Sequence, residues 1–336
     1  MKNSSVLPKR IGCLGGGLRI LSAGVIVLMI LLAIGYSYQR QTTAADFQQF
    51  PAPGQLVDVG GYRMHIYCQG EGNPTVIVDS GLGDFSLSWS QVQPEVARFS
   101  RICTYDRAGY GWSDPHPVPR TAQQIALELH TLLDKANIEG PYVLVGHSLG
   151  GAHVRMVASL YPEEVVGMVL VDAMHEDIQT RDPQLYQEQQ QLSAQWNVMK
   201  LMAQFGALRM MGKSAGAQSL PDYIKQLPAD KQEVYMILNS HPAFFETALG
   251  EWQIVGESCE QLREAGELGD LPLVVLTKGI DLESDWQALQ DDLASLSTNS
   301  TQVQAEDSGH FIQLERPDLV IAAIQQVVDQ SRTQTP

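Results

Sequence analysis

The stretch PYVLVGHSLGGAHV, from Pro141 to Val154, contains the feature that decides the fold. Its apolar run 142–145 predicts a buried strand, the glycines that follow predict a sharp turn, and residues 149–160 carry the apolar spacing of a helix. The turn, GHSLG at 146–150, fits the pattern Gly-x-Ser-x-Gly. A strand, turn and helix in this order place the hydroxyl of Ser148 at a helix N-terminus, where free N–H groups favour developing negative charge. We therefore predict that Ser148 is a nucleophile.

Short apolar runs on both sides of this unit predict an α/β fold. A hairpin is expected around Gly60-Gly61, and helices are expected at 121–136, 285–296 and after Pro317. Strands that alternate with helices indicate a mostly parallel sheet, and continuous apolar strands indicate burial on both faces. The expected strands after the hairpin and outside the central stretch are TVIVD (75–79), RICTY (101–105), VVGMVLV (165–171), LPLVVLT (271–277) and a weaker one at 301–305.

The alternation stops in the middle of the chain. From about His175 to Ala265 the sequence is rich in Gln, Met, Leu and Ala, and it contains no convincing strand. We predict a helical cap at 175–266, inserted over the carboxyl edge of a core that comprises 55–174 and 267–332. Flexible apolar side chains above a nucleophile suit a hydrophobic ligand. Those in and beside the cap include Met174, Met199, Met202, Met210 and Met211.

The first forty residues predict a membrane anchor. Lys2, Lys9, Arg10 and Arg19 precede an apolar run from Ile20 to Ile34, and with the flanking residues up to Tyr38 this segment is just long enough to cross a hydrocarbon layer of about 30 Å. Positive charge before the run places the tail in the cytoplasm and exports the rest of the chain. The alternative is a cleaved signal peptide with small residues at 33 and 35, which gives a secreted or periplasmic protein. Residues 41–54 are predicted to form a polar linker.

Charge and cysteine content limit the possible partners. The net charge of −16 excludes a nucleic-acid surface, which requires a basic face. Cys68 and Cys103, both in predicted strands, are the best candidates for one disulfide in an exported domain, but we favour buried free thiols. No Cys-x-x-Cys or His-x-x-x-His spacing indicates a metal site.

A serine nucleophile needs a base, and His310 is our candidate. It stands in EDSGHFIQLERPD, between the last predicted strand and the last helix, and therefore in a loop at the same edge of the sheet as Ser148. Histidines that fit this position less well are His65, His116, His130 and His147.

These motifs resemble those of the α/β-hydrolase fold family. GHSLGG is similar to its nucleophile elbow, DRAGYGWSD to the loop after its fourth strand, and SGHFIQLERPD to its histidine loop, in the family's order across 55–329. The resemblance implies an eight-stranded, mostly parallel sheet with helices on both faces and a triad in the order Ser, acid, His. A serine at the elbow disfavours the epoxide hydrolase and haloalkane dehalogenase branches, which use aspartate there.

The sequence alone does not decide which carboxylate is the acid of the triad. Asp172 in VLVDAMHED and Asp281 in TKGIDLESDW both follow predicted strands at the catalytic edge, and Glu283 and Asp285 lie close to the second position. We favour Asp172 and retain Asp281 as the alternative. Either carboxylate would orient the imidazole and stabilise it when it is protonated.

The resemblance also implies two backbone donors for an oxyanion, the N–H groups of Leu149 and Leu82. The family commonly has His-Gly in the second loop, whereas this chain has Ser80 and Gly81 before Leu82. Asp106 and Arg107 of DRAGYGWSD are read as structural.

The expected function is a serine hydrolase that cleaves a small hydrophobic ester or related acyl bond. This chemistry needs no metal or organic cofactor. Because a fold does not fix a reaction, an aminopeptidase, a lactonase, a carbon–carbon hydrolase and a cofactor-free haloperoxidase stay open. A ligand receptor with slow turnover is the main alternative of another class, and a non-catalytic anchored scaffold is a third.

Overall fold

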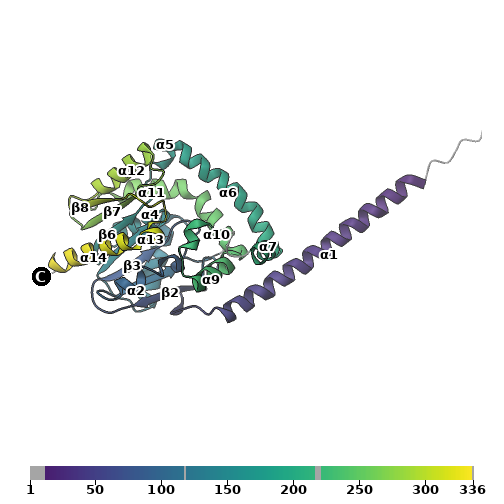
Figure 1. The fold of residues 1–336 in the computed structure, drawn as a ribbon, viewed down its shortest axis with the longest axis horizontal. Helices are drawn as coiled ribbons and strands as arrows, with labels where there is room; N and C mark the ends of the chain where they lie inside the picture. The colour runs from purple at the N-terminus through teal and green to yellow at the C-terminus, as the bar shows by residue number, and fades with distance from the viewer. Residues whose placement is uncertain (1–11, 117–118, 216–220, 335–336) are drawn as a thin grey trace, which may run out of the picture.

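The computed structural model describes residues 12–116, 119–215 and 221–334, and one eight-stranded sheet forms its centre (Figure 1). The sheet is antiparallel from the first strand to the third in spatial order and parallel beyond it, which confirms the predicted fold class. In spatial order the strands are β1 (Gln55–Asp58), β2 (Arg63–Gln69), β4 (Ile102–Asp106), β3 (Thr75–Asp79), β5 (Tyr142–His147), β6 (Val165–Val171), β7 (Leu273–Lys278) and β8 (Ser300–Ala305).

Helices cover both faces of this sheet, because alternate side chains of its central strands point to opposite sides. On β5, Leu144 belongs to one apolar cluster, and Val143 and Val145 belong to the other. The helices on the first face are α3 (Ala122–Lys135), α4 (Leu149–Leu160), α11 (Val255–Ala265) and α12 (Ser284–Ser295), and those on the second are α2 (Gln93–Val96) and α14 (Pro317–Gln334). Thr121 caps α3, as its sequence predicts, by accepting a hydrogen bond from the Gln124 N–H.

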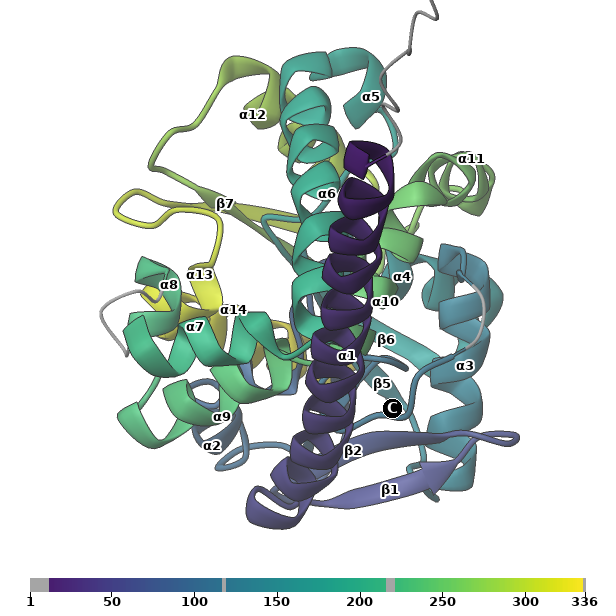
Figure 2. The same ribbon diagram turned by 90° about the vertical axis from the view of Figure 1, so that its right-hand side faces the viewer.

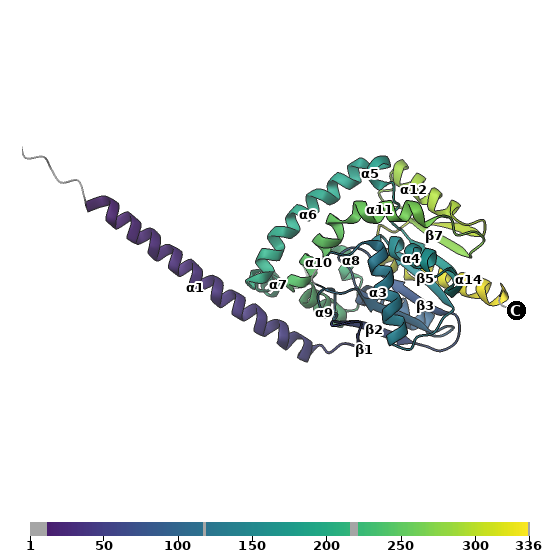
Figure 3. The ribbon, with the colours of Figure 1, turned by 180° about the vertical axis from the view of Figure 1, so that it is seen from behind.

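Between β6 and β7 the described residues form helices and no strand, and these helices extend over the carboxyl edge of the sheet (Figure 3). We use the name cap helices for α5 (Ile178–Arg181), α6 (Pro183–Gln204), α7 (Ala207–Ala215), α8 (Asp222–Lys225), α9 (Ala229–Asn239) and α10 (Pro242–Gln253). The next helix, α11, packs against α3 and α4 instead. The predicted cap range therefore includes one helix of the sheet layer.

The N-terminal helix α1 spans Gly12–Gln49, so the predicted linker is wrong for residues 41–49. No proline or glycine interrupts residues 41–49, and the helix ends at Gln49, two residues before Pro51. The part from Arg19 onward is long and apolar enough to cross a membrane, and its apolar side chains are exposed. Figure 1 shows the N-terminal portion of α1 extending away from the rest of the molecule, while its C-terminal end lies beside it.

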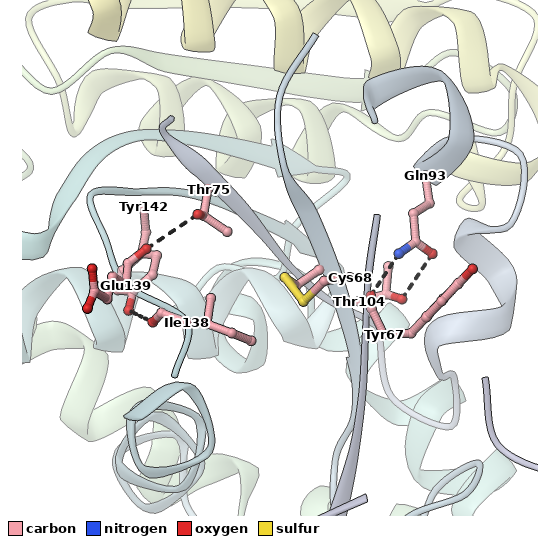
Figure 4. The surroundings of a disulfide bond; sticks show 9 residues. Tyr67, Cys68, Thr75, Gln93, Thr104, Ile138, Glu139 and Tyr142 are labelled. Carbon is pink, nitrogen blue, oxygen red and sulfur yellow. Dashed lines mark hydrogen bonds between the residues drawn. A yellow bond between two sulfur atoms is a disulfide. The ribbon is translucent and has the colours of Figure 1, made fainter. Parts of the chain in front are cut away.

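Cys68 and Cys103 form a disulfide, which corrects our preference for free thiols (Figure 4). The reason is the register of β2 and β4: the two residues lie directly opposite each other on neighbouring antiparallel strands. The third of the predicted buried thiols, Cys259, is free and buried.

Candidate active site

Ser148 lies in the tight turn between β5 and α4, as the sequence predicts. Its backbone has a φ of 52°, in the left-handed region that costs energy for any residue other than glycine. The chain can turn here because a Cβ at Gly146 would lie 2.6 Å from the Gly150 oxygen, and a Cβ at Gly150 would lie 2.4 Å from the Asp79 oxygen. The glycines therefore allow β5, α4 and the end of β3 to meet closely at the serine.

His310 and Asp172 come together beside this turn. Asp172 follows β6, and His310 lies between β8 and the short helix α13 (Ile312–Glu315). His310 Nδ1–H donates to Asp172 Oδ2 at 2.6 Å. His310 is partly exposed, and with Ser148 it lines one cavity. The bond to Asp172 uses Nδ1, so Nε2 is the imidazole nitrogen available to act as a base.

The surroundings of Asp172 favour its charged form. The carboxylate is fully buried, and it accepts hydrogen bonds from Trp286 Nε1–H at 2.9 Å and from the Lys278 N–H at 3.0 Å. Burial raises the pKa of Asp172, but these hydrogen bonds and the one from His310 together hold the pKa below its usual value. The sequence gives no sign of the contact with Trp286, which stands 114 residues away along the chain.

Asp281 lies elsewhere. It follows β7 in an exposed turn with a φ of 51°, and it is not among the residues that line the cavity. Of the two aspartates that the sequence left open, the structure brings only Asp172 to His310.

His147 holds the backbone of the histidine loop. Its Nε2–H donates to the His310 carbonyl at 2.9 Å, and its Nδ1 accepts from the Gln313 amide at 3.3 Å. Burial, with a smaller contribution from His310, lowers the pKa of His147 to about 3. His147 is therefore neutral at physiological pH and positions His310.

The other candidate bases have different surroundings. His65 Nδ1 pairs with the Asp106 carboxylate at 2.8 Å in the buried core, and His130 pairs with Glu164 at 3.1 Å. His116 stacks edge-on with Tyr62. Of the eight histidines of the chain, the cavity is lined by His147 and His310.

Arg107 holds the loop after β3, which contains Leu82. Its guanidinium donates to the carbonyl oxygens of Ser80 at 2.6 Å and of Gly81 at 2.8 Å. Trp89 Nε1–H donates to the Ser80 hydroxyl at 3.0 Å, at the position where the family commonly has histidine. Leu149, as the first residue of α4, has no intrahelical acceptor for its N–H. Leu82 and Leu149 both line the cavity.

Glu251 of α10 links this loop to the cap helices. It accepts from Arg107 Nε–H at 2.9 Å and from the Tyr110 hydroxyl at 3.0 Å, and all three side chains are buried. Burial raises the pKa of Glu251, but the Arg107 guanidinium holds it below its usual value. Sequence reasoning identified Arg107 as structural and missed Glu251, because its partner lies 144 residues away.

A second buried carboxyl, Asp84, links the same loop to α9. It accepts from the Ser88 hydroxyl at 2.7 Å and from the Tyr235 hydroxyl at 3.1 Å. No cation contacts it directly among the described residues, and burial raises its pKa to about 6 despite these hydrogen bonds. Asp84 therefore keeps its proton to a higher pH in the folded protein than an ordinary aspartate does.

We predict that Asp84→Asn reduces the pH dependence of stability. The folded carboxyl keeps its proton to a higher pH than the unfolded one, so its stabilising contribution is full below the ordinary pKa of 3.8 and is lost as pH rises through about 6. Between about pH 4 and pH 7.5, the wild type should lose on the order of 1–3 kcal/mol relative to the variant. Thermal unfolding in detergent at both pH values measures this difference. Asp281→Asn, at an exposed carboxyl, is the control, and equal pH effects in all three proteins would contradict the prediction.

The cavity above Ser148 has a volume of about 1150 Å³. Its floor carries Ser148, His310 and the loop of Leu82, and its walls come from the cap helices. The walls are mostly apolar, and their large side chains include Leu185, Trp196, Met199, Phe244, Phe245 and Trp252. A site with this shape accommodates an apolar ligand of substantial size.

Comparison with known proteins agrees with this architecture. A sequence model of the alpha/beta hydrolase fold matches residues 74–317. An uncharacterized protein of Bacillus subtilis, YqjL, is 27% identical over 275 residues, which cover 80% of this chain and 89% of that protein. The probable transporter efuK of Hormonema carpetanum is 37% identical over 136 residues, but this match covers 38% of this chain and 20% of the transporter.

Two solved structures show the same fold. A thermophilic esterase from Thermogutta terrifontis has a TM-score of 0.59 at 20% identity, covering 82% of this chain and 98% of the esterase. The epoxide hydrolase CorEH has a TM-score of 0.60 at 18% identity, with the same two coverages. At these identities the likeness concerns the fold alone.

Proposed function

Because this chain belongs to the α/β-hydrolase fold family, we propose that it is a serine hydrolase that cleaves an ester or related acyl bond. The observation that carries the proposal is the hydrogen bond from His310 to the buried Asp172, beside a serine at the tip of a strained turn. In this proposal Ser148 is the nucleophile, His310 the base and Asp172 the carboxylate that orients the base, which are the three parts of a serine triad.

The proposed reaction has two halves. His310 Nε2 takes the proton of the Ser148 hydroxyl as its oxygen attacks the acyl carbonyl, and the oxyanion accepts hydrogen bonds from the Leu149 and Leu82 N–H groups. The protonated imidazole then gives its proton to the leaving alcohol, and an acyl-enzyme forms. Water, deprotonated by His310, attacks this ester, and the acid product leaves with the serine restored. Asp172 stabilises the imidazolium in both halves.

The substrate we propose is a small hydrophobic molecule with an ester or related acyl bond. The support is the cavity, whose apolar walls from the cap helices lie over the serine. A receptor with slow turnover would use the same cavity, and the other reactions of the family would use the same serine. A receptor differs from the proposed hydrolase in the rate at which the acyl-enzyme on Ser148 is hydrolysed, and the other reactions differ in the product that is released.

We also propose that α1 anchors the protein in a membrane and that the hydrolase domain lies on the exported side. The apolar side chains of α1 between Arg19 and Ile34 are exposed in the structure, as is expected for a lipid-facing segment. The disulfide between Cys68 and Cys103 fits an exported domain, because such bonds persist in oxidising compartments.

A fluorophosphonate probe tests the hydrolase proposal. We expect one probe per chain on the peptide that contains Ser148, and release of acid from hydrophobic esters by the unlabelled protein. Mass spectrometry of digests gives the labelled position, and Ser148→Ala is the control. Labelling of Ser148 together with very slow release of acid from esters would indicate a receptor. Absence of labelling in the folded protein would contradict the serine mechanism.

A further inference from the structure

The carboxyl-terminal part of α1 is docked on the cap helices through buried polar contacts. Asp46 of α1 accepts from Arg209 Nη1–H of α7 at 3.0 Å and pairs with His241 Nε2 at 3.0 Å. Gln39 Oε1 accepts from Arg209 Nε–H at 3.3 Å, and all four side chains are buried. Breaking a buried charge pair of this kind is costly. The helix therefore has a defined position against the cap.

The docking also fixes the position along α1 at which this helix separates from the rest of the molecule. A Cβ at Gly35 would lie 2.6 Å from the Phe205 carbonyl oxygen, and a Cβ at Gly206 would lie 2.9 Å from the Tyr38 ring. Phe205 and Gly206 form the turn between α6 and α7. Figure 2 shows α1 crossing in front of α6. The α6–α7 turn is thus level with residues 35–38 of α1.

At this position along α1, the residue types are those found where a helix leaves a membrane. Tyr36 and Tyr38 are partly exposed and directly follow the apolar run, and the Arg40 guanidinium lies 6.0 Å from the Tyr36 ring centre. Tyrosine and arginine at the end of an apolar helix are typical of the interface between lipid and water. From Arg19 to Tyr36 the helix rises about 27 Å, close to the thickness of the hydrocarbon layer.

Large apolar side chains are exposed on both sides of the α6–α7 turn. Val198 is 59% exposed, Leu201 57% and Met211 57%, although all three belong to helices that also carry buried or half-buried residues. Met211 lines the active-site cavity as well, as does Leu192, which is 38% exposed. We use the name apolar face for Val198, Leu201 and Met211, which lie on the two helices joined by the α6–α7 turn, and of which Met211 also lines the cavity.

We propose that this apolar face rests on the bilayer surface, and that a lipophilic ester passes from the bilayer across it into the cavity. The proposal rests on the proposed anchoring by α1 and on the proposed ester hydrolysis. Lipid is the occupant that the face fits, because its residues flank the α6–α7 turn, and this turn packs against α1 at residues 35–38, where the apolar segment of α1 ends. The docked Asp46 and Arg209 hold the face at that level.

Depth-dependent fluorescence quenching in phosphatidylcholine vesicles tests the contact. The full chain, with Cys13→Ser, carries one introduced cysteine with an environment-sensitive label: Leu201→Cys on the apolar face, Leu127→Cys on α3, or Ile30→Cys in the apolar part of α1. Leu127 is the matched control, because it is an exposed leucine (40%) outside the cap helices. Nitroxide lipids with the spin label near the headgroup or deep in the acyl chain serve as quenchers.

We expect deep quenching at position 30, shallow quenching at position 201 and none at position 127. Quenching at 30 but not at 201 would overturn the contact and leave the anchor intact. Absence of quenching at 30 would overturn the anchor and, with it, this inference. The readout requires no catalysis, so a failure of the hydrolase proposal is seen separately, as absence of fluorophosphonate labelling.

A second measurement tests the entry route. Leu201→Glu should keep the turnover of a water-soluble short-chain ester, since Leu201 does not line the cavity, and should lose about tenfold in turnover of a long-chain ester embedded in vesicles. Leu127→Glu should change neither rate. Equal rates on the embedded ester in the two variants would overturn entry across this face.

Discussion

Ser148→Ala is expected to lower kcat/KM for a short-chain p-nitrophenyl ester by about 10⁴- to 10⁶-fold. The variant loses the only atom that would form the acyl-enzyme, while the cavity and the N–H groups of Leu82 and Leu149 stay in place. His310→Ala should cause a loss of the same order, because the serine hydroxyl is a weak nucleophile without its base. Spectrophotometric assays of the purified chain in detergent give both values.

The double variant makes this prediction sharper. If Ser148 and His310 act as one unit, removing both should lower the rate no further than removing one, because the residual catalysis comes from binding and the oxyanion donors. Unchanged thermal midpoints in the three variants show that the fold is intact. Losses that multiply in the double variant would indicate that the two residues act in separate steps.

Asp172→Asn is expected to lower kcat by about 10⁴-fold, whereas Asp281→Asn should leave the rate within about twofold of the wild type. An asparagine at position 172 cannot stabilise the imidazolium, and its amide favours the wrong tautomer of His310. Asp281 lies in an exposed turn outside the cavity, so its carboxylate has no such role.

The two substitutions form a matched pair, since both aspartates follow a strand and both have a positive φ. Trp286 and Lys278 still have an oxygen to donate to in Asp172→Asn, so we expect the folded structure to persist. The measurement is kcat with a saturating ester, together with the thermal midpoint of each variant. A large loss in Asp281→Asn with normal activity in Asp172→Asn would reverse the assignment of the acid.

Much of the fold could be predicted because it depends on short-range patterns. The apolar run of β5, the glycines around Ser148 and the helical spacing of α4 all lie within twenty residues, so the strand, turn and helix follow from local propensity. His310 could be placed at the same edge because the carboxyl ends of parallel strands share that edge. The catalytic roles of Ser148 and His310 stay predictions that the variants above test.

Other features depend on distances between remote segments, which no local pattern encodes. The register of β2 against β4 places Cys68 opposite Cys103, and the packing of α10 on the core brings Glu251 to Arg107. The linker prediction was wrong for residues 41–49, because polar composition does not distinguish an irregular segment from a helix whose polar residue Asp46 pairs with Arg209.

The sequence by itself therefore determined the hydrolase fold and the position of the turn at Ser148, since both follow from apolar periodicity and from where glycine stands. Only the tertiary structure decided which aspartate meets His310, because Asp172 and Asp281 both follow parallel strands at the same edge, and it is the folding of the loops after those strands that buries Asp172 beside His310 and leaves Asp281 exposed. It also decided where α1 lies on the cap helices, because that position depends on a buried ion pair between residues 163 positions apart.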